Sequence, residues 1–318
     1  MHGVKRRAEI VVGARGSMLS VLQTESVIAQ LRALAPEQEF VLKKITTLGD
    51  RKAEWSRADT GIFVKELEEA LARDEIDIAV HSVKDMPSRL PEGLQLAAIP
   101  RREDPRDMLI TANGTDLAGL PADARLGTSS LRRRAQLLRL RPTLRIEGLR
   151  GNLDSRIRKL REGRYDAIVV AAAGVRRLDV RDIHYQLLSH ETVLPAPGQG
   201  ALGLEIRSDD TLRQTLVAGI DDRVTHVCVA CEREFLHRTQ AGCRMPVAAL
   251  AAVDKDTITL DAMIISLDGQ KAVRVQQQSR LDQSSALAGA QQLGAAVAQQ
   301  LLARGGARIL EEIRHAQE

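Results

Sequence analysis

Aromatic residues are scarce in this chain of 318 amino acids, since Phe, Trp and Tyr together make up only 2% of it. Hydrophobic residues nevertheless reach 44%, so the core must be built mainly from Leu, Ile, Val and Ala. Proteins that bind single-stranded nucleic acid commonly stack the bases on aromatic side chains, and the shortage argues against such a platform. We therefore expect no nucleic-acid partner.

Long apolar runs and an even set of cysteines are also missing. No stretch reaches the roughly 18 apolar residues typical of a membrane-spanning helix. The basic N-terminal segment passes directly into the strand-like Val11-Val12-Gly13, without the apolar stretch of a secretory signal. Three cysteines give no disulfide framework. These features predict a cytoplasmic protein with no membrane partner.

Positive charge is concentrated in one segment. Between Arg125 and Arg177 there are 15 Lys and Arg residues and 4 Asp and Glu residues, a surplus of eleven positive charges. Because the whole chain carries only +4, the remaining residues have a net charge of −7. The segment is therefore a localised basic surface, either a set of solvated helix faces or a site for an anion.

Strand-like and helix-like patterns alternate through the first two thirds of the chain, which favours an α/β fold with parallel, doubly wound sheets. Helices are expected at 18–34, 63–73, 131–140 and 156–162. Strands are expected at 9–13, 40–47, 76–81, 144–146, 167–172 and 202–206. After about Asp221 a helix at 224–238, alternating strands to about Arg280 and two alanine-rich helices indicate a small α+β domain.

Proline-rich crossovers near Pro100–Pro105 and Pro195–Gly200 divide the pattern into two similar lobes. The expected domains are a first lobe of residues 1–104 and 198–221, a second, arginine-rich lobe of residues 105–197, and a C-terminal domain of residues 222–318.

Arginines follow successive strand ends in the second lobe. Ligands of such sheets bind at the carboxyl ends of the strands. A planar guanidinium can bind two oxygens of a carboxylate or phosphate, and a helix N-terminus behind a Gly-Thr-Ser-Ser turn offers backbone N–H groups to an anion. The candidate anion-binding residues are Ser129, Arg132, Arg133, Arg150, Arg156, Arg176 and Arg177.

The first lobe holds a possible acid–base pair, Lys84-Asp85, at a strand end. An aspartate there could donate a proton or stabilise a developing cation, or it could simply form the turn before Met86-Pro87. Arg15 and Ser17 occupy another strand-to-helix turn and could bind a second anion.

The three cysteines fall into two groups. Cys228-x-x-Cys231 lies near Cys243, His226 and His237, which superficially suggests zinc. However, Cys228 and Cys231 fall inside a continuous helical pattern, and we expect no metal. Cys243 lies in a Gly-Cys turn, where a thiol can be accessible and could serve as a covalent attachment point.

Taken together, these residues resemble the porphobilinogen deaminases, also called hydroxymethylbilane synthases. The resemblance covers nearly the whole chain. Its most specific stretches are Phe63-Val64-Lys65-Glu66-Leu67-Glu68, Asp77-Ile78-Ala79-Val80-His81-Ser82-Val83-Lys84-Asp85-Met86-Pro87, Arg102-Glu103-Asp104-Pro105-Arg106-Asp107, Gly127-Thr128-Ser129-Ser130-Leu131-Arg132-Arg133, Leu149-Arg150-Gly151-Asn152, Pro197-Gly198-Gln199-Gly200 and Gly242-Cys243.

The resemblance implies three domains, of which the first two are like a two-lobed periplasmic binding protein. It implies a monomeric enzyme of tetrapyrrole and heme biosynthesis that joins four porphobilinogen molecules head to tail, releases ammonia at each step and hydrolyses the product to hydroxymethylbilane. A dipyrromethane cofactor would be attached through a thioether to Cys243.

The resemblance also implies roles for individual residues. Asp85 would be the catalytic carboxylate, assisted by Lys84, and Gln199 would lie near the lobe interface. The cofactor would be bound by Cys243, Ser129, Arg132, Arg133, Arg150, Lys84 and Asp85. The substrate would be bound by Arg15, Ser17, Arg150, Arg156 and Arg177. Each pyrrole carries an acetate and a propionate, so a bank of arginines suits the growing chain.

One departure from the family pattern concerns a loop. Bacterial relatives usually have Gly-Lys-Gly where this chain has Thr60-Gly61 after Asp59. Arg57 is the nearest cation on the N-terminal side of Thr60, and it either replaces the missing charge or is solvated. Two rival functions remain, a non-catalytic binding module for an organic polyanion and a nucleic-acid binder.

Overall fold

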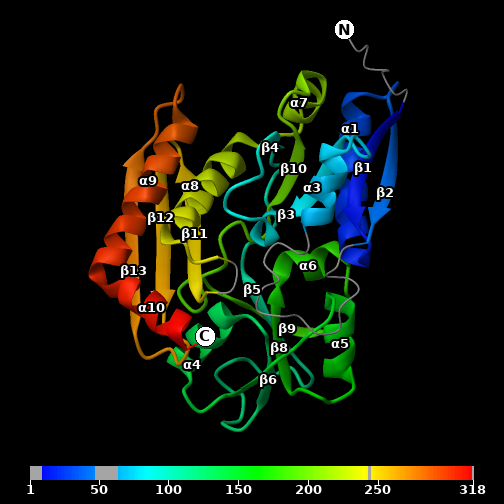
Figure 1. Cartoon of the computed structure of the whole chain (residues 1–318). Helices are drawn as coiled ribbons and strands as arrows, with labels where there is room; N and C mark the ends of the chain where they lie inside the picture. The colour runs from blue at the N-terminus through cyan, green and yellow to red at the C-terminus, as the bar shows by residue number, and fades with distance from the viewer. Residues whose placement is uncertain (1–8, 47–63, 243–244, 317–318) are drawn as a thin grey trace. The chain divides into compact units, whose positions relative to one another are not determined.

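The computed structural model describes residues 9–46, 64–242 and 245–316. The chain divides into two compact units, Met1–Arg101 with Leu202–Arg223, and Arg102–Ala201 with Val224–Glu318 (Figure 1). No helix in the described ranges is both long and apolar enough to cross a membrane.

The first unit is built on one five-stranded sheet with helices on both faces. Its strands, in the order β2-β1-β3-β10-β4, are β1 (Glu9–Arg15), β2 (Glu39–Ile45), β3 (Ile78–Ser82), β4 (Leu94–Ala98) and β10 (Leu202–Arg207). Its helices are α1 (Met18–Leu34), α3 (Lys65–Ala72), the 3₁₀ turn η1 (Val83–Asp85) and α7 (Thr211–Ala218). Val12 and Ile10 pack with α1 on one face, and Val11 and Ala79 pack with α3 on the other. The alternation of apolar side chains along β1 therefore buries both faces.

A second five-stranded sheet, in the second unit, repeats this order. It runs β7-β6-β8-β5-β9, with β5 (Asp107–Thr111), β6 (Arg125–Gly127), β7 (Arg145–Glu147), β8 (Ala167–Ala171) and β9 (His184–Leu188). Helix α4 (Leu131–Leu140) covers one face, while α5 (Leu153–Arg161) and α6 (Ala172–Arg177) lie over the other. Each sheet thus begins with three parallel strands, continues with a strand that follows a crossover (β10 or β5), and ends with an outer strand (β4 or β9).

The sheets are mixed rather than wholly parallel, which corrects the parallel arrangement expected above. Strand β10 is antiparallel to both β3 and β4, and β5 is antiparallel to both β8 and β9. In each sheet the reversed strand is the one that follows a crossover, which is β10 in the first sheet and β5 in the second. The predicted α/β class, with two similarly wound lobes and a small C-terminal α+β part, is confirmed.

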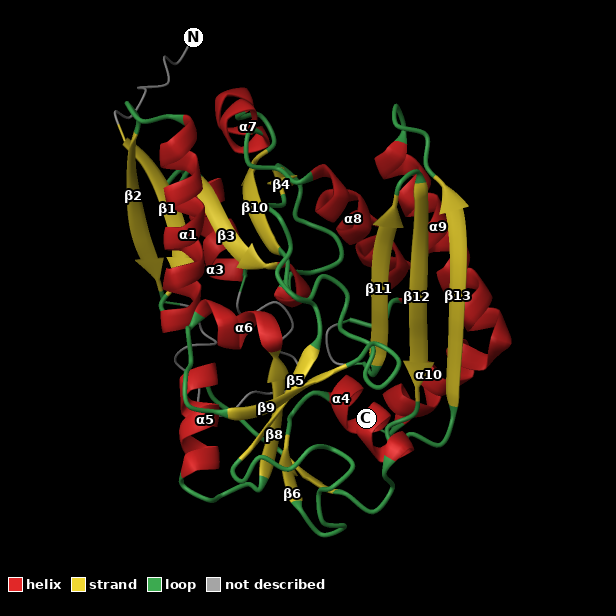
Figure 2. Cartoon of the chain, turned by 180° about the vertical axis from the view of Figure 1, so that it is seen from behind, coloured by secondary structure: helices red, strands yellow, loops and turns green. Residues whose placement is uncertain are grey.

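The C-terminal part of the second unit is a three-stranded antiparallel sheet. It consists of β11 (Val247–Asp254), β12 (Thr257–Ile265) and β13 (Ala272–Arg280). Helices α8 (Arg223–Thr239), α9 (Ala286–Leu301) and α10 (Ala307–His315) lie against one face (Figure 2), with the π-helical turn Leu302–Gly306 between the last two. On the other face Ala248 and Met263 pack against Ala135 of α4. This part therefore shares a core with the second lobe.

Candidate active site

Two loops meet at one edge of the second sheet. Strands β7, β6 and β8 are parallel neighbours, so the segments that follow them leave the sheet at the same edge. The Ser129 hydroxyl, after β6, donates a hydrogen bond of 2.9 Å to the carbonyl of Leu149, after β7. Arg156 Nε donates to the carbonyl of Gly151 at 2.7 Å. Ser129 and Arg156 therefore each bind a backbone carbonyl next to Arg150.

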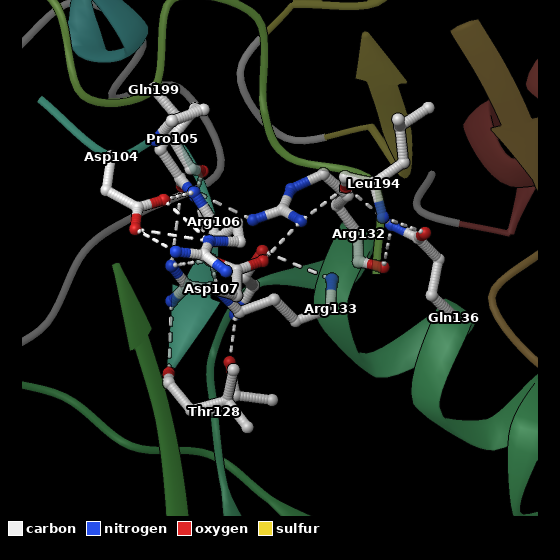
Figure 3. Close-up of polar contacts among 12 residues, drawn as sticks. Asp104, Pro105, Arg106, Asp107, Thr128, Arg132, Arg133, Gln136, Leu194 and Gln199 are labelled. Atoms are coloured by element: carbon white, nitrogen blue, oxygen red, sulfur yellow. Dashed lines mark hydrogen bonds and ion pairs between the residues drawn. The ribbon is translucent and has the colours of Figure 1, made fainter. Parts of the chain in front are cut away.

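Arg132 and Arg133 begin helix α4 but their side chains turn inward. Both are bound to the carboxylate of Asp107, the first residue of β5 (Figure 3): Arg132 Nη1 lies 2.7 Å from Oδ2, and Arg133 Nη2 lies 2.7 Å from Oδ1. The three side chains are 5%, 6% and 0% exposed. Both guanidiniums are therefore already engaged in ion pairs inside the protein.

Backbone carbonyls and Gln199 complete this network. Arg132 Nη1 also donates to the carbonyl of Leu194, and Arg133 Nη1 donates to that of Val169. The fully buried Gln199 donates through Nε2 to Asp107 Oδ1 at 2.9 Å and to the carbonyl of Pro105 at 2.6 Å. The segment around Gln199 is therefore fixed to the start of β5 by side-chain hydrogen bonds.

The network has a surplus of positive charge. Burial by itself would raise the pKa of Asp107, but the charges of Arg132 and Arg133 outweigh it and hold that pKa far below its usual range. Asp107 is therefore ionised at neutral pH, and one negative charge faces two positive ones. A surplus of one positive charge in a nearly dry region favours an anion beside it.

Arg176 and Arg177 lie at the end of α6, which follows β8. Arg177 Nη2 donates to the carbonyl of Gly200 at 2.8 Å, and burial lowers the pKa of this arginine. Arg176 is more exposed and forms ion pairs with Glu103 and Asp104 at 2.9 and 3.0 Å. Arg177 is therefore the more enclosed of the two predicted cations.

A second buried ion pair joins the crossover segments to helix α8. The guanidinium of Arg102 lies 2.6 Å from the carboxylate of Glu232, whose side chain is 0% exposed. Glu232 also accepts hydrogen bonds from the backbone N–H groups of Gly198 and Ala251. One carboxylate thus holds three segments that are far apart in the sequence.

In the first unit, Lys84 and Asp85 lie on the turn η1 directly after β3, both partly exposed. The buried Met86 follows and anchors the turn. Ser17 caps helix α1 by accepting a hydrogen bond from the N–H of Ser20, and Arg15 ends β1. The predicted first-lobe residues therefore lie at the carboxyl ends of the neighbouring parallel strands β1 and β3.

The cysteines of helix α8 are packed in the core. Cys228 and Cys231 are 5% and 0% exposed, and burial raises the pKa of the Cys231 thiol, which disfavours the thiolate that a metal requires. Across the described ranges no three His, Cys, Asp or Glu side chains are grouped as metal ligands. Cys243, Thr60 and Arg57 lie outside the described residues.

Asp107 is the site residue that sequence reasoning missed. The sequence does contain one indication of it, because an aspartate that directly precedes the apolar run Met108-Leu109-Ile110 enters a buried strand and must find a counter-ion. The candidate counter-ions in the sequence are Arg132 and Arg133, which lie 25 and 26 residues after Asp107.

Known proteins resemble this chain over almost its entire length. A family model described as "Porphobilinogen deaminase, dipyromethane cofactor binding domain" matches residues 10–215, and one described as "Porphobilinogen deaminase, C-terminal domain" matches residues 226–303. Among curated relatives, the porphobilinogen deaminase of Syntrophobacter fumaroxidans is 43% identical, with 96% of this chain and 98% of the relative covered.

Two further relatives carry the same name. The porphobilinogen deaminase of Thermus thermophilus is 44% identical, with 96% of this chain and 99% of the relative covered. That of Brevibacillus brevis is 45% identical, with 95% and 96% covered. With both family models matching in order and the relatives aligned from end to end, the chain belongs to the porphobilinogen deaminase family.

Proposed function

We propose that the side chains at the carboxyl edges of the two five-stranded sheets carry out the reaction of this family. The chain is a transferase of tetrapyrrole biosynthesis, which condenses four porphobilinogen molecules head to tail with release of ammonia and hydrolyses the product to hydroxymethylbilane. The observation that carries this proposal is the match of the cofactor-binding domain model over residues 10–215. That range contains every candidate site residue except Cys243.

The described residues fit a dipyrromethane cofactor, which bears several carboxylates. The Asp107 network leaves one positive charge uncompensated, and it belongs to the same sheet as Ser129 and Arg150. We propose that Cys243 holds the cofactor through a thioether and that its carboxylates and pyrrole N–H groups are bound by Ser129, Arg132, Arg133, Arg150, Lys84 and Asp85. When bound, the cofactor supplies the pyrrole carbon to which the first substrate is added.

The substrate carboxylates are proposed to bind Arg15, Ser17, Arg150, Arg156 and Arg177. Arginine suits this role because its rigid fork matches a carboxylate in two hydrogen bonds. Arg177 supports the proposal most directly, since it is held by the carbonyl of Gly200 and is enclosed enough for burial to lower its pKa. A cation that already bears a desolvation cost gains more from an incoming carboxylate than a solvated one does.

Asp85 is proposed as the catalytic carboxylate. In each condensation the C–N bond of the aminomethyl group breaks and ammonia leaves with the electron pair. A C–C bond then forms, and the attacking pyrrole carbon loses its hydrogen as a proton. The Asp85 carboxylate would accept hydrogen bonds from pyrrole N–H groups and stabilise the cation left by ammonia, with Lys84 assisting. This proposal is supported by the position of Asp85 on the short turn η1, at the end of the central strand β3.

We further propose a cytoplasmic monomer with no nucleic-acid or membrane partner. The arginines of the basic segment are partly used inside the protein, since Arg132 and Arg133 bind Asp107 and Arg125 binds Asp166. We also propose that the lobes comprise residues 1–104 with 198–221 and residues 105–197, with 222–318 as the third domain.

The experiment that tests the function combines an activity assay with intact-mass spectrometry. Purified protein should consume porphobilinogen, release ammonia and yield hydroxymethylbilane, and its mass should exceed the sequence mass by two pyrrole units. A protein that binds porphobilinogen without releasing ammonia would instead be a binding module for organic anions. Tight binding of DNA or RNA with a steep salt dependence would support the remaining rival.

A further inference from the structure

Two buried ionisable side chains of the first unit, His81 and Glu205, interact electrostatically with a third, Glu68, which is only half-buried. His81 lies on β3, Glu205 on β10, and Glu68 on helix α3, which packs across β1, β3, β10 and β4 (Figure 1). His81 Nε2 is 2.8 Å from Glu205 Oε2, and these two side chains are 3% and 0% exposed. We call Glu68, His81 and Glu205 the buried triad, after its two buried members, since Glu68 itself is half-buried.

The triad is poorly satisfied by hydrogen bonds. Glu68 Oε1 and both carboxylate oxygens of Glu205 have no hydrogen-bond partner among the residues that the structure describes, and the short His81–Glu205 contact is not aligned as a hydrogen bond. An unsatisfied buried charged group costs free energy, so such groups in a native protein call for an explanation. Packing alone does not explain these groups, because apolar residues would fill the same space at a lower cost in free energy.

The turn that carries Asp85 is seated on the same face of the sheet as the triad. Gly203 pairs with His81 and is two residues before Glu205, so the three positions share that face. A β-carbon placed on Gly203 would lie 2.6 Å from Leu96 Cδ1 of β4, and then 3.2 Å from Val83 Cγ2 and 3.3 Å from Met86 Sδ. Val83 and Met86 stand on either side of Lys84 and Asp85 in the sequence. Their side chains therefore pack the turn against Gly203, beside the triad.

The charge of Glu68 changes near neutral pH. Burial and, to a smaller extent, the negative charge of Glu205 raise its pKa to about 7 against the opposing effect of His81. Above this pH Glu68 adds a negative charge to the triad. The other charged residues of the surrounding elements are Lys65, Glu66 and Glu69 of α3, Glu9 and Arg15 of β1, Lys84 and Asp85 of η1, and Arg207 of β10, whereas β4 has none.

We propose that the buried triad supplies a negative charge beneath the turn of Asp85, and that this charge promotes the cationic step of the reaction. The inference rests on the proposed function, in which ammonia leaves a cation behind. A fixed charge of opposite sign stabilises a developing cation, and the effect is stronger where the charge is partly shielded from water. Glu68, His81 and Glu205 act through the turn and its field, so they are positioning residues.

This role predicts that activity and stability respond to pH in opposite directions. Because the folded state raises the pKa of Glu68 above its ordinary value of 4.5, the stabilisation by its proton is complete below that value and is lost as the pH rises through about 7. The same ionisation creates the charge that the reaction uses. Turnover should therefore rise with pH over the range in which thermal stability falls.

The test is the substitution Glu68→Gln, which keeps the shape and removes the charge. At about pH 8 kcat should fall by about two- to thirtyfold, the range in which a charge acts through a neighbouring element. At about pH 6, where Glu68 is protonated in the wild type, the two proteins should turn over at similar rates. KM for porphobilinogen and the cofactor mass should not change, and the melting temperature at pH 8 should rise.

Two further variants separate the charge from its surroundings. Glu69→Gln is the matched control, because Glu69 is the next residue of α3 but is exposed and paired with Lys65 and Arg73. It should match the wild type in both measurements. Glu68→Asp retains the charge and should recover part of the rise of kcat with pH.

Three outcomes would overturn the inference. If the wild type condenses porphobilinogen and Glu68→Gln has the same pH profile, the triad plays no part in the reaction although the proposed function stands. If Glu68→Gln lowers kcat equally at pH 6 and 8 and also melts earlier, the triad is only structural. If the wild type releases no ammonia from porphobilinogen, the proposed function and this inference both fail.

Discussion

Replacing Asp107 by Asn tests how much the buried arginine pair depends on its single carboxylate. The amide keeps the shape and can still accept hydrogen bonds, but Arg132 and Arg133 lose their counter-ion in a region where both are about 5% exposed. Removing one partner of a buried ion pair typically costs about 3–5 kcal/mol, because the remaining charge stays uncompensated. We expect a loss of this size in the free energy of unfolding.

The assay is equilibrium urea denaturation followed by far-UV circular dichroism at pH 7, with Asp166→Asn as the matched control. Asp166 also binds an arginine, Arg125, with a shortest distance of 3.0 Å, but these side chains are 45% and 37% exposed. An exposed pair contributes about 0–1 kcal/mol. If the two substitutions lowered the unfolding midpoint equally, burial would not determine the strength of the Asp107 pairs and the reasoning would be wrong.

The pH dependence of this loss follows from the direction of the pKa shift. Because folding lowers the pKa of Asp107, its contribution is present above the unfolded pKa of about 3.9 and is lost only as the pH falls through the folded value. The difference between wild type and Asp107→Asn should therefore be constant from about pH 5 to pH 9. A difference that disappeared by pH 5 would contradict a carboxylate held so firmly in its ionised form.

Three other predictions concern the proposed catalytic residues. Cys243→Ala should give a folded protein without the two-pyrrole mass and without activity, whereas Cys228→Ala, in the core of α8, should keep the adduct; intact-mass spectrometry of both variants decides. Asp85→Ala should fold but lose about 10²–10⁴-fold in turnover, and a variant that kept more than about a tenth of the wild-type rate would exclude Asp85 as the catalytic carboxylate. Arg150→Leu should reduce cofactor assembly or early elongation, since a charged hydrogen bond contributes about 1.5–3 kcal/mol. Arg158→Leu, an exposed arginine of α5, should leave both unchanged, and equal behaviour of the two variants would show that Arg150 is simply solvated.

Helix positions could be predicted from the sequence where a capping residue marks the start. Helices α1 and α4 begin and end where the periodicity placed them, because Ser17 and Ser130 each accept a backbone N–H of the first turn. Strand β5 was not predicted, although it is central to its sheet. It has only five residues, and a short apolar run without alternation does not distinguish a strand from a buried loop.

The antiparallel direction of β5 and β10 also could not be predicted from the sequence. The direction of a strand depends on the end of the sheet at which the chain arrives after a crossover. Neither residue propensity nor hydrophobic periodicity predicts that end. The loops of Ser129 and Arg150 lie together, as the hydrogen bond from the Ser129 hydroxyl to the carbonyl of Leu149 shows, because consecutive parallel strands end at one edge. The inward turn of Arg132 and Arg133 could not be foreseen, since it depends on a partner, Asp107, from a separate part of the chain.

The carboxylate of Glu232 has a consequence for how the chain can be divided. The C-terminal sheet has its own strands and its own family model, which makes it look like a module that could be removed or exchanged. Yet Glu232 is the counter-ion of Arg102 and the acceptor for Gly198, so a chain cut before α8 would leave a buried guanidinium and a buried N–H without partners. A chimera built by swapping C-terminal segments between relatives must therefore transfer Arg102 and Glu232 as a matched pair.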